Sequence, residues 1–538
     1  MNAVTAQPDP SNTPLTPLSF LGRSADVWAD KVAVVDDGRQ LTYAEFAEQA
    51  QAVARALEAA GVAPGDRVAY LMPNVTEQLV AHFAVPLAGG VLVAINTRLA
   101  APEIGYILEH SGAKVLVVDG RLEQLAGRAL ADTPGDITLV VANRKGDPVA
   151  GATTYEDFLA AGTDTVFPWE VEDELAPISI NYTSGTTGRP KGVVYTHRGA
   201  YLNALGELLH SRHSPESVYL WTLPMFHCNG WCTPWAITAY GARHVCLPEV
   251  RGDRIWELIR QEGVTHLNAA PTVLTAIMAA DSAGELPQPV TVTTAGAPPS
   301  PTTIGQMEDL GFTLIHVYGL TETYGPYSVC EVQEPWLSLG PDERARLKAR
   351  QGVGMLQAER LRVVDQDMVD VPADGATMGE IVMRGNNVMA GYFRDPEGTQ
   401  EAFRGGWFHS GDLGVMHPDG YVELRDRAKD VVISGGENIS TVEVEQALMS
   451  HPAVSEAAVV GVPDPDWGER PKGFVTVRQG ATTTGEELIA HVRSRIAHYK
   501  APREVELVHE LPKTSTGKIQ KFVLREAEWD SKESRIQG

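Results

Sequence analysis

Short apolar runs alternate with helical patterns along the first part of the chain, and this alternation is the strongest constraint on its fold. The runs Val68–Leu71, Val91–Ile95 and Val115–Val118 have the length of buried strands, and segments with a helical period separate them. Upstream, Thr42 and Glu45 have the spacing of a capping box at the start of a helix. Strands that alternate with helices form mostly parallel sheets covered by helices, so we expect an α/β fold.

A change of pattern near residue 428 predicts a second, smaller domain. The chain has 538 residues, which is enough for two or three cores. After the polar segment Asp426–Asp430 come a strand, a turn with two glycines, and a capped helix. We therefore expect a large N-terminal domain over residues 1–427 and a small C-terminal lid over residues 428–538.

The overall charge limits the classes of partner. A formal net charge of −25 argues against binding to nucleic acid or to an anionic membrane surface. The longest apolar stretch, Leu79–Ile95, is interrupted by His82 and Pro86, so we expect a helix running into a strand and no membrane span. The N-terminus lacks the pattern of a secretory signal, and we expect a cytoplasmic protein. Its oligomeric state is open, with a homodimer as one option.

A segment rich in glycine and hydroxyl residues joins two further strand patterns. It reads Thr183-Ser184-Gly185-Thr186-Thr187-Gly188-Arg189-Pro190-Lys191-Gly192. Its small residues leave backbone N–H groups free to surround a polyphosphate, and Arg189 and Lys191 supply positive charge. It is not a Walker A sequence, because no Gly-Lys-Ser/Thr closes it. Composition alone leaves a flexible hairpin as the alternative.

This segment resembles the signature phosphate loop of the adenylate-forming superfamily, which includes acyl-CoA synthetases, peptide synthetase adenylation domains and firefly-type luciferases. The resemblance extends from about residue 15 to residue 525. It is closest to plant-type peroxisomal acyl-activating enzymes for short-chain, medium-chain or aromatic acids, through Pro224–Trp231, Tyr318–Pro326 and Asp430–Ser440. It implies a large domain of helix-covered, mostly parallel sheets with a small β-barrel-like part, and a mobile α+β lid.

The resemblance also implies the residues that bind ATP, Mg²⁺ and coenzyme A. Tyr318 would stack on adenine, Thr321 would donate to the α-phosphate, and Glu322 would hold Mg²⁺, which needs only one or two carboxylates beside phosphate oxygens. Asp412 and Arg427 would bind the ribose. Without the resemblance, Glu322 would be interpreted as a solvated surface acid and Asp412 as a loop acid that caps a turn. The whole set is Thr183, Ser184, Gly185, Thr186, Thr187, Gly188, Lys191, Gly296, Ala297, Pro298, Tyr318, Gly319, Thr321, Asp412, Arg427, Gly435 and Gly436.

Lys518 follows a glycine in the predicted lid, and the resemblance makes it the lysine that bridges the substrate carboxylate and the α-phosphate. A carboxylate that approaches an anionic phosphate needs a cation between them. Because Lys518 lies far from the phosphate loop in sequence, the lid must close and later turn. The resemblance makes Lys429 the hinge and brings Gly435 and Gly436 to the pantetheine arm of CoA. A tight turn is the alternative for these two glycines.

The segment Pro224–Trp231 resembles the motif that opens the acyl pocket. His227 stands where amino-acid-activating relatives carry an aspartate, so an α-amino acid is a poor candidate substrate. No Lys, Arg, Asp or Glu occurs in Pro224–Trp231, Ala269–Thr272 or Gly325–Tyr327, which favours an acid without further charge. Alternatively, His227 and Trp231 are core residues without contact to substrate. The predicted acid-binding residues are His227, Trp231, Gly296, Tyr318 and Gly325.

Together these features predict an ATP-dependent carboxylic acid:CoA ligase that acts through an acyl-AMP intermediate and releases pyrophosphate. The main alternative is an adenylating enzyme of the same fold that passes the acid to an amine, a carrier protein or an inorganic nitrogen species. An inactive nucleotide-binding scaffold is disfavoured, because the charged motif positions are intact. No feature requires luciferase-like oxidation. The candidate catalytic residues are Lys518, Thr321, Glu322, His227 and Lys429, with Glu322 as the metal ligand.

Overall fold

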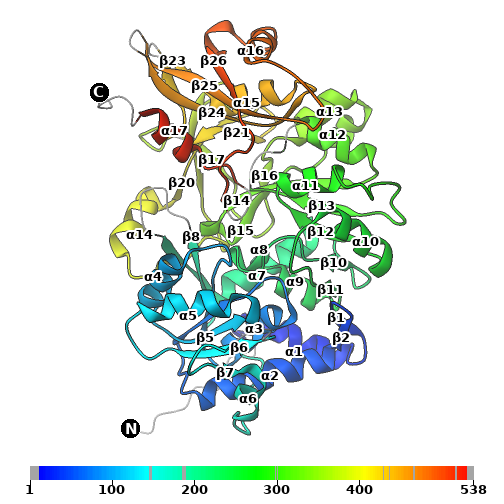
Figure 1. The fold of residues 1–538 in the computed structure, drawn as a ribbon, viewed down its shortest axis with the longest axis vertical. Coiled ribbons are helices and arrows are strands. Elements are labelled where there is room, and N and C mark those ends of the chain that lie inside the picture. Colours follow the sequence, from blue (N-terminus) through cyan, green and yellow to red (C-terminus); the bar gives the residue numbers. More distant parts are fainter. Residues whose placement is uncertain are drawn as a thin grey trace.

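Four sheets organise the chain, and Figure 1 shows the C-terminal lid at the opposite end of the molecule from α2 (Tyr43–Ala59) and α6 (Tyr155–Ala160). The computed structural model describes residues 11–143, 148–183, 190–296, 299, 301–427, 429–434, 437–464, 467–514 and 518–529. Within these residues the sheets have nine, eight, four and five strands. None of the helices described in these ranges is both long and apolar enough to cross a membrane.

The eight-stranded sheet carries the segment that precedes the predicted phosphate loop. Its strand order is β19-β9-β8-β4-β3-β5-β6-β7, parallel from β8 to β7 and antiparallel at β8–β9 and β9–β19. The strands are β3 (Arg67–Leu71), β4 (Val91–Ala94), β5 (Ala113–Asp119), β6 (Thr138–Ala142), β7 (Thr153–Thr154), β8 (Pro177–Thr183), β9 (Lys191–Thr196) and β19 (Gly391–Tyr392). The helices of this region are α2 (Tyr43–Ala59), α3 (Thr76–Leu87), α4 (Ala101–Ser111), α5 (Glu123–Ala131) and α6 (Tyr155–Ala160).

The nine-stranded sheet has the order β16-β15-β14-β13-β12-β10-β11-β1-β2 and is parallel except at its two ends. Its strands are β1 (Val32–Asp36), β2 (Arg39–Thr42), β10 (Val218–Leu220), β11 (Arg243–Val245), β12 (His266–Ala269), β13 (Thr291–Thr294), β14 (Thr313–Leu320), β15 (Gly325–Val329) and β16 (Val353–Gly354). Further helices of the large domain are α1 (Leu18–Val27), α7 (His197–His210), α8 (Cys228–Trp231), α9 (Thr233–Ala239), α10 (Gly252–Glu262), α11 (Pro271–Met278), α12 (Pro301–Asp309) and α13 (Pro341–Lys348).

One hydrophobic core lies between these two sheets. Every residue of α3 is buried, including the polar Glu77, Gln78 and His82, so the whole helix is packed inside this core. The core joins Tyr70 of the eight-stranded sheet to Trp221, which directly follows β10 of the other sheet. The long apolar stretch 79–95 is thus a buried helix followed by a strand, as predicted. The capping box of Thr42 and Glu45 is present at the start of α2.

A smaller antiparallel sheet and the lid complete the chain. The third sheet, β17-β18-β20-β21, is the part that we expected to resemble a barrel. Its elements are β17 (Arg362–Val364), β18 (Met378–Met383), β20 (Phe408–Met416), β21 (Val422–Arg427) and the nearby helix α14 (Pro396–Ala402). The lid contains β22 (Val432–Ser434), β23 (Glu437–Ile439), α15 (Thr441–Met449), β24 (Val454–Asp464), β25 (Gly468–Val477), α16 (Gly485–Arg493), β26 (Glu504–Leu507) and α17 (Lys521–Trp529). Short 3₁₀ turns are η1 (Gly120–Leu122), η2 (Thr321–Thr323), η3 (Glu334–Ser338), η4 (Arg404–Gly406) and η5 (His498–Lys500).

The α/β fold with a small α+β C-terminal domain is confirmed. Lid residues such as Val444, Val459 and Val475 form a hydrophobic cluster of their own, separate from the main core. The strand β21 ends at Arg427. The exact domain boundary between residues 427 and 428 stays a prediction.

Candidate active site

The carboxyl ends of β12, β13 and β14 bring the predicted site residues to one edge of the nine-stranded sheet. These strands are parallel and end at Ala269, Thr294 and Leu320. Ligands of open α/β sheets bind beyond the carboxyl ends of parallel strands. Gly296 and Thr321 follow two of these strands within two residues, so both lie at this edge.

Three predicted residues meet at what we call the nucleotide end of the site: Tyr318, Asp412 and Arg427. The Tyr318 hydroxyl donates to Asp412 Oδ2 at 2.7 Å, and Arg427 Nε lies 3.1 Å from Asp412 Oδ1. Asp412 and Arg427 are partners across β20 and β21, and Asp412 is buried. Burial, and then the charge of Asp412, raises the pKa of the Tyr318 hydroxyl, which therefore remains a donor. A carboxylate held on both oxygens by fixed donors is preorganised.

The lid brings Lys518 to this end. Lys518 lies three residues before the start of α17. Burial, followed by the charge of Arg427, lowers the pKa of Lys518 to about 8, while Asp412 acts in the opposite direction. Protein atoms therefore surround the ammonium group, although the residue as a whole keeps solvent-exposed surface. Lys429, the predicted hinge, is also exposed, and burial of its ammonium group lowers its pKa against the opposing charge of Asp430.

The charge of Lys518 also reaches His227. Burial lowers the pKa of His227 to about 4, and the charge of Lys518 is the second cause. The imidazole is therefore neutral at physiological pH. Lys518 thus stands within electrostatic range of both the nucleotide end and His227, which belongs to the segment that we call the acyl end, residues 225–232.

Glu322 and Lys191 both contact Tyr392. The Tyr392 hydroxyl donates to Glu322 Oε1 at 2.9 Å, and Lys191 Nζ lies 4.5 Å from the centre of the Tyr392 ring. Lys191 is also 3.3 Å from Asp395 and pairs with Thr183 across β8 and β9. Burial raises the pKa of Glu322, and no lysine or arginine in the described part of the chain forms an ion pair with it.

Nine predicted site residues lie outside the described residues, and their arrangement stays a prediction. They are Ser184, Gly185, Thr186, Thr187 and Gly188 of the phosphate loop, Ala297 and Pro298 after β13, and Gly435 and Gly436 of the lid.

At the acyl end, two glycines allow a close approach of the surrounding chain. Gly325 has φ +98°, and a Cβ built on it would lie 2.6 Å from the Trp231 ring. A Cβ on Gly319 would lie 1.9 Å from the Gly325 carbonyl oxygen. Any side chain at either position would displace Trp231 or the backbone. Trp231 itself is buried and packs beside Val317, at the same sheet edge as Thr321.

The acyl end contains an uncommon turn of left-handed backbone. Cys228, Asn229, Gly230, Trp231 and Cys232 have φ values of 50°, 47°, 56°, 59° and 63°. Left-handed backbone costs about 1–2 kcal/mol for each ordinary L-residue, and asparagine and glycine tolerate it best. Strain of this kind persists only where the surroundings fix it, and it is frequent at functional sites.

The buried side chain of Asn229 fixes this turn to β8. Its Oδ1 accepts hydrogen bonds from the Ser179 hydroxyl and from Asn181 Nδ2, both at 2.7 Å. Its backbone N–H donates to Asn181 Oδ1 at 3.2 Å. On the other side, the Cys228 thiol donates to Thr321 Oγ1 at 3.3 Å. The turn therefore connects the strand before the phosphate loop to the residue predicted to contact the α-phosphate.

Sequence reasoning missed Tyr392, Asp395, Asn229 and its partners. Asp395 stands before Pro396 with the pattern of a helix N-cap, and it does cap α14 through Gly398. That signal identifies a helix start, whereas the contact with Lys191 comes from the tertiary fold. For Asn229 the sequence offers only the adjacent Asn-Gly pair, which indicates a turn and not its length.

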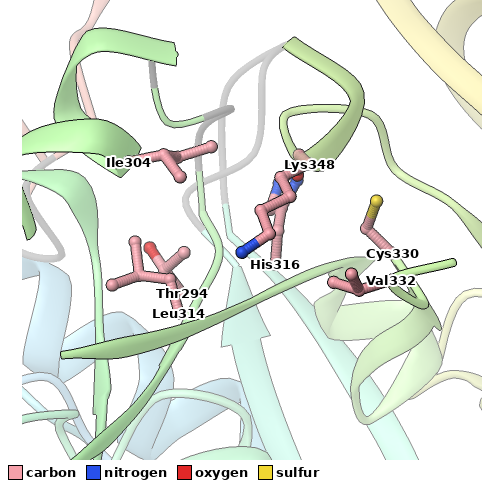
Figure 2. Close-up of a pocket in the computed structure, with 7 residues that line it drawn as sticks. All are labelled: Thr294, Ile304, Leu314, His316, Cys330, Val332 and Lys348. Carbon is pink, nitrogen blue, oxygen red and sulfur yellow. The ribbon is translucent and has the colours of Figure 1, made fainter. Parts of the chain in front are cut away.

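A small cavity beside β13 and β14 is not part of this site. Figure 2 shows its lining, which includes Thr294, His316 and Lys348. Its volume of about 10 Å³ holds at most one water molecule. None of the predicted catalytic residues lines it, so we interpret it as a packing gap.

Comparisons with known proteins agree with this arrangement of two domains around a nucleotide site. Residues 21–393 match the family described as AMP-binding enzyme, and residues 443–518 match its C-terminal domain. The chain is 45% identical to the peroxisomal acetate/butyrate–CoA ligase AAE7 of Arabidopsis thaliana, covering 96% of this chain and 95% of that protein.

Two solved structures are similar along the whole chain. The anthranilate CoA ligase AuaEII, in complex with anthranoyl-AMP, has a TM-score of 0.86 and 26% identity, covering 97% of this chain and 98% of that chain. The amide bond synthetase McbA of Marinactinospora thermotolerans has a TM-score of 0.82 and 28% identity, covering 94% and 99%.

These findings define a ligase that uses a nucleotide to activate its substrate, and the chain belongs to the AMP-binding enzyme family. Within that family, the prediction of an AMP-forming acid–CoA ligase is confirmed by relatives that are 43–45% identical over nearly the full chain. ATP binding, CoA as acceptor and a carboxylic acid substrate follow at this level.

Proposed function

We propose that the protein converts a short, otherwise uncharged carboxylic acid to its CoA thioester through an acyl-adenylate. The observation that carries this proposal is the position of Lys518. Its charge acts on Asp412 and Arg427 at the nucleotide end and on His227 at the acyl end. A cation between the two ends is what a carboxylate needs in order to approach an anionic phosphate.

In the first half-reaction, a carboxylate oxygen of the acid attacks the α-phosphorus of ATP. The new O–P bond forms as the bond to pyrophosphate breaks, and pyrophosphate leaves with the electron pair. Asp412, held by Tyr318 and Arg427, orients the ribose. Lys518 and the Thr321 hydroxyl stabilise the charge that builds on the α-phosphate, and Lys191 neutralises the leaving group.

Glu322 suits a magnesium ion. The residue is half-buried, the pKa of its carboxyl group is raised, and it lacks an ion-pair partner among the described residues, so a cation at this position would stabilise its ionised form. Mg²⁺ would be held by Glu322 together with phosphate oxygens and would neutralise charge on the phosphates. Tyr392 keeps the carboxylate in place.

In the second half-reaction, the CoA thiol attacks the acyl carbon, and AMP leaves. A free thiol has a pKa of roughly 8.5, so some thiolate is available without a strong protein base. His227 is neutral at physiological pH and serves as a hydrogen-bonding and shape-determining residue. The lid turns about Lys429 between the halves, which removes Lys518 and presents the segment around Gly435 and Gly436 to CoA.

The size and charge of the acid are set by the acyl end. His227 is neutral and Trp231 closes one side, pressed against Gly325. A small apolar acyl chain fits such a surface. The α-amino group of an amino acid, in contrast, would find no carboxylate partner at the position of His227. Acetate and butyrate, the substrates named for the Arabidopsis relative, have this chemistry. Replacing Trp231 by alanine would extend the range to longer or aromatic acids.

A second candidate is transfer of the activated acid to an amine. The structural similarity to an amide bond synthetase favours it, since that protein has the same fold. We further propose a cytoplasmic location, with a homodimer as one option for the oligomeric state.

The test is pyrophosphate release with ATP, Mg²⁺ and acids from acetate through octanoate to benzoate and cinnamate, each with and without CoA. We expect multiple turnovers only with CoA, with a thioester as product and short acids as best substrates. Turnover without CoA that requires an added amine would support the second candidate. Absence of pyrophosphate release with every acid would contradict both.

A further inference from the structure

A cluster of buried polar side chains joins the lid to the strand that carries Arg427. We call Asp426, Thr441, Glu445 and Lys521 the hinge cluster. Asp426 Oδ2 accepts from the backbone N–H of Thr441 at 2.5 Å and from its hydroxyl at 2.8 Å. Lys521 Nζ donates to the same hydroxyl oxygen at 2.6 Å and lies 2.7 Å from Glu445 Oε1.

These contacts are shielded from water, which makes their loss costly. Asp426 and Thr441 are 1% and 0% exposed. Burial alone would lower the pKa of the Lys521 ammonium group. The charges of Glu445 and Asp426 outweigh this effect, and the pKa is raised. A buried charged group that loses its partner retains its desolvation cost.

Only one member of the hinge cluster belongs to the large domain. Asp426 is the penultimate residue of β21, three residues before the predicted hinge at Lys429. Thr441 and Glu445 belong to α15, and Lys521 is the first residue of α17. The hydrogen bonds between Asp426 and Thr441 therefore cross the predicted hinge. The contacts of Lys521 with Thr441 and Glu445 lie within the lid.

The position of Lys521 connects this cluster to the reaction site. Lys521 follows Lys518 by three residues, so fixing the start of α17 also limits where Lys518 can lie. On the other side of the hinge, Arg427 is the direct neighbour of Asp426 and pairs with Asp412. A short path of contacts thus runs from Lys518 through the hinge cluster back to the nucleotide end.

We propose that Asp426, Thr441 and Lys521 are positioning residues for acyl-adenylate formation, because they fix the start of α17 against β21 and thereby hold Lys518 at the nucleotide end. This inference rests on the proposed function, in which Lys518 acts in the first half-reaction alone. None of the three residues touches the reacting atoms.

Other contacts that fasten α17 provide a matched comparison. Glu528, near the other end of the helix, pairs with Lys472 at 2.7 Å, and Lys472 also pairs with Glu504 and Glu506 at 3.0 Å. Lys472 belongs to β25, so this network lies entirely within the lid. It stabilises the lid without crossing the hinge.

The experiment separates the two half-reactions in the full-length protein. Pyrophosphate release in a single turnover measures adenylation, and thioester formation from supplied acyl-adenylate and CoA measures the second half. The variants are Asp426→Asn, Lys521→Met and Thr441→Val, with Glu528→Gln as the control, and the melting temperature of each is recorded.

We expect Asp426→Asn and Lys521→Met to slow adenylation by roughly 10- to 100-fold, the effect of losing a buried hydrogen bond to a charged group. Thr441→Val keeps its backbone donor and should lose less. Thioester formation should stay unchanged in all three, and Glu528→Gln should leave both halves unchanged.

Two results would overturn the inference: equal losses in both halves, which indicate a purely structural role, or unchanged adenylation in Asp426→Asn and Thr441→Val. If Lys521→Met does not fold, the milder Thr441→Val variant still decides between these outcomes. A wild-type protein that releases no pyrophosphate would instead contradict the proposed function.

Discussion

The two ends of the candidate site are built in different ways. The nucleotide end gathers polar and charged groups from two sheets and from both domains, with Tyr318, Asp412 and Arg427 in the large domain and Lys518 in the lid. The acyl end is neutral and lies in one domain, and its shape comes from a strained turn held by Asn229. A reaction in two steps needs charge that can be withdrawn, whereas recognition of a small acid needs a surface that does not move.

The largest effect is expected from removing Lys518, the charge that the lid brings to the nucleotide end. Lys518→Ala should slow adenylation by at least about 10²–10³-fold, because it removes the cation between carboxylate and phosphate. Thioester formation from supplied acyl-adenylate should be nearly unchanged. Single-turnover pyrophosphate release and thioester formation measure the two halves.

Lys513 provides the matched control for this prediction. It lies in the same lid segment and pairs with Glu456 at 2.7 Å, within the lid. Lys513→Ala should therefore leave adenylation close to the wild-type rate. Equal losses for Lys513→Ala and Lys518→Ala would show that the segment, and not the charge at residue 518, is what matters.

The next effect concerns the fixed part of the nucleotide end. Tyr318→Phe removes one donor to Asp412 while keeping the ring, and a hydrogen bond to a charged group contributes about 1.5–3 kcal/mol. The Michaelis constant for ATP should rise by roughly tenfold or more, and that for the acid should change little. A rise for the acid alone would mean that Tyr318 belongs to the acyl end.

The contrast between the two ends also separates what the sequence could and could not predict. Tyr318, Asp412, Arg427 and Lys518 stand in motifs whose roles only the family resemblance implied, and the fold brings all four to one end of the site. The alternation of strands and helices likewise predicted the parallel sheets, because the apolar pattern of each element can be recognised from neighbouring residues alone. The five-residue left-handed turn is different. Cysteine and tryptophan do not favour positive φ, so only its tertiary contacts stabilise it.

A paired substitution at Asn229 tests how far shape alone determines the acyl end. Asn229→Gly removes the side-chain hydrogen bonds to Ser179 and Asn181 but tolerates φ 47°, whereas Asn229→Ala removes the same bonds and also carries the backbone strain. Alanine should therefore lower the free energy of unfolding by about 1–2 kcal/mol more than glycine. Both should raise the Michaelis constant for the acid, by about tenfold for alanine, and leave that for ATP unchanged. Chemical denaturation and steady-state kinetics measure the two effects, and identical behaviour of the two variants would exclude strain as a factor.

The smallest expected effect is a difference in pH response between the two ends. The pKa of Lys518 is lowered to about 8, and its protonated form is the one that stabilises phosphate charge, so activity should fall as pH rises through that value. Between pH 7 and about pH 8.5 the protonated fraction of a group with this pKa falls about four-fold, and adenylation at low ATP concentration should fall equally. Lys518→Arg keeps its charge across this range, and its profile should be flat even if its rate is lower. His227, with a pKa of about 4, stays neutral throughout and should add no transition. A fall that persists in Lys518→Arg and disappears in a His227 variant would assign the pH dependence to the acyl end and reverse the division of roles between the two ends.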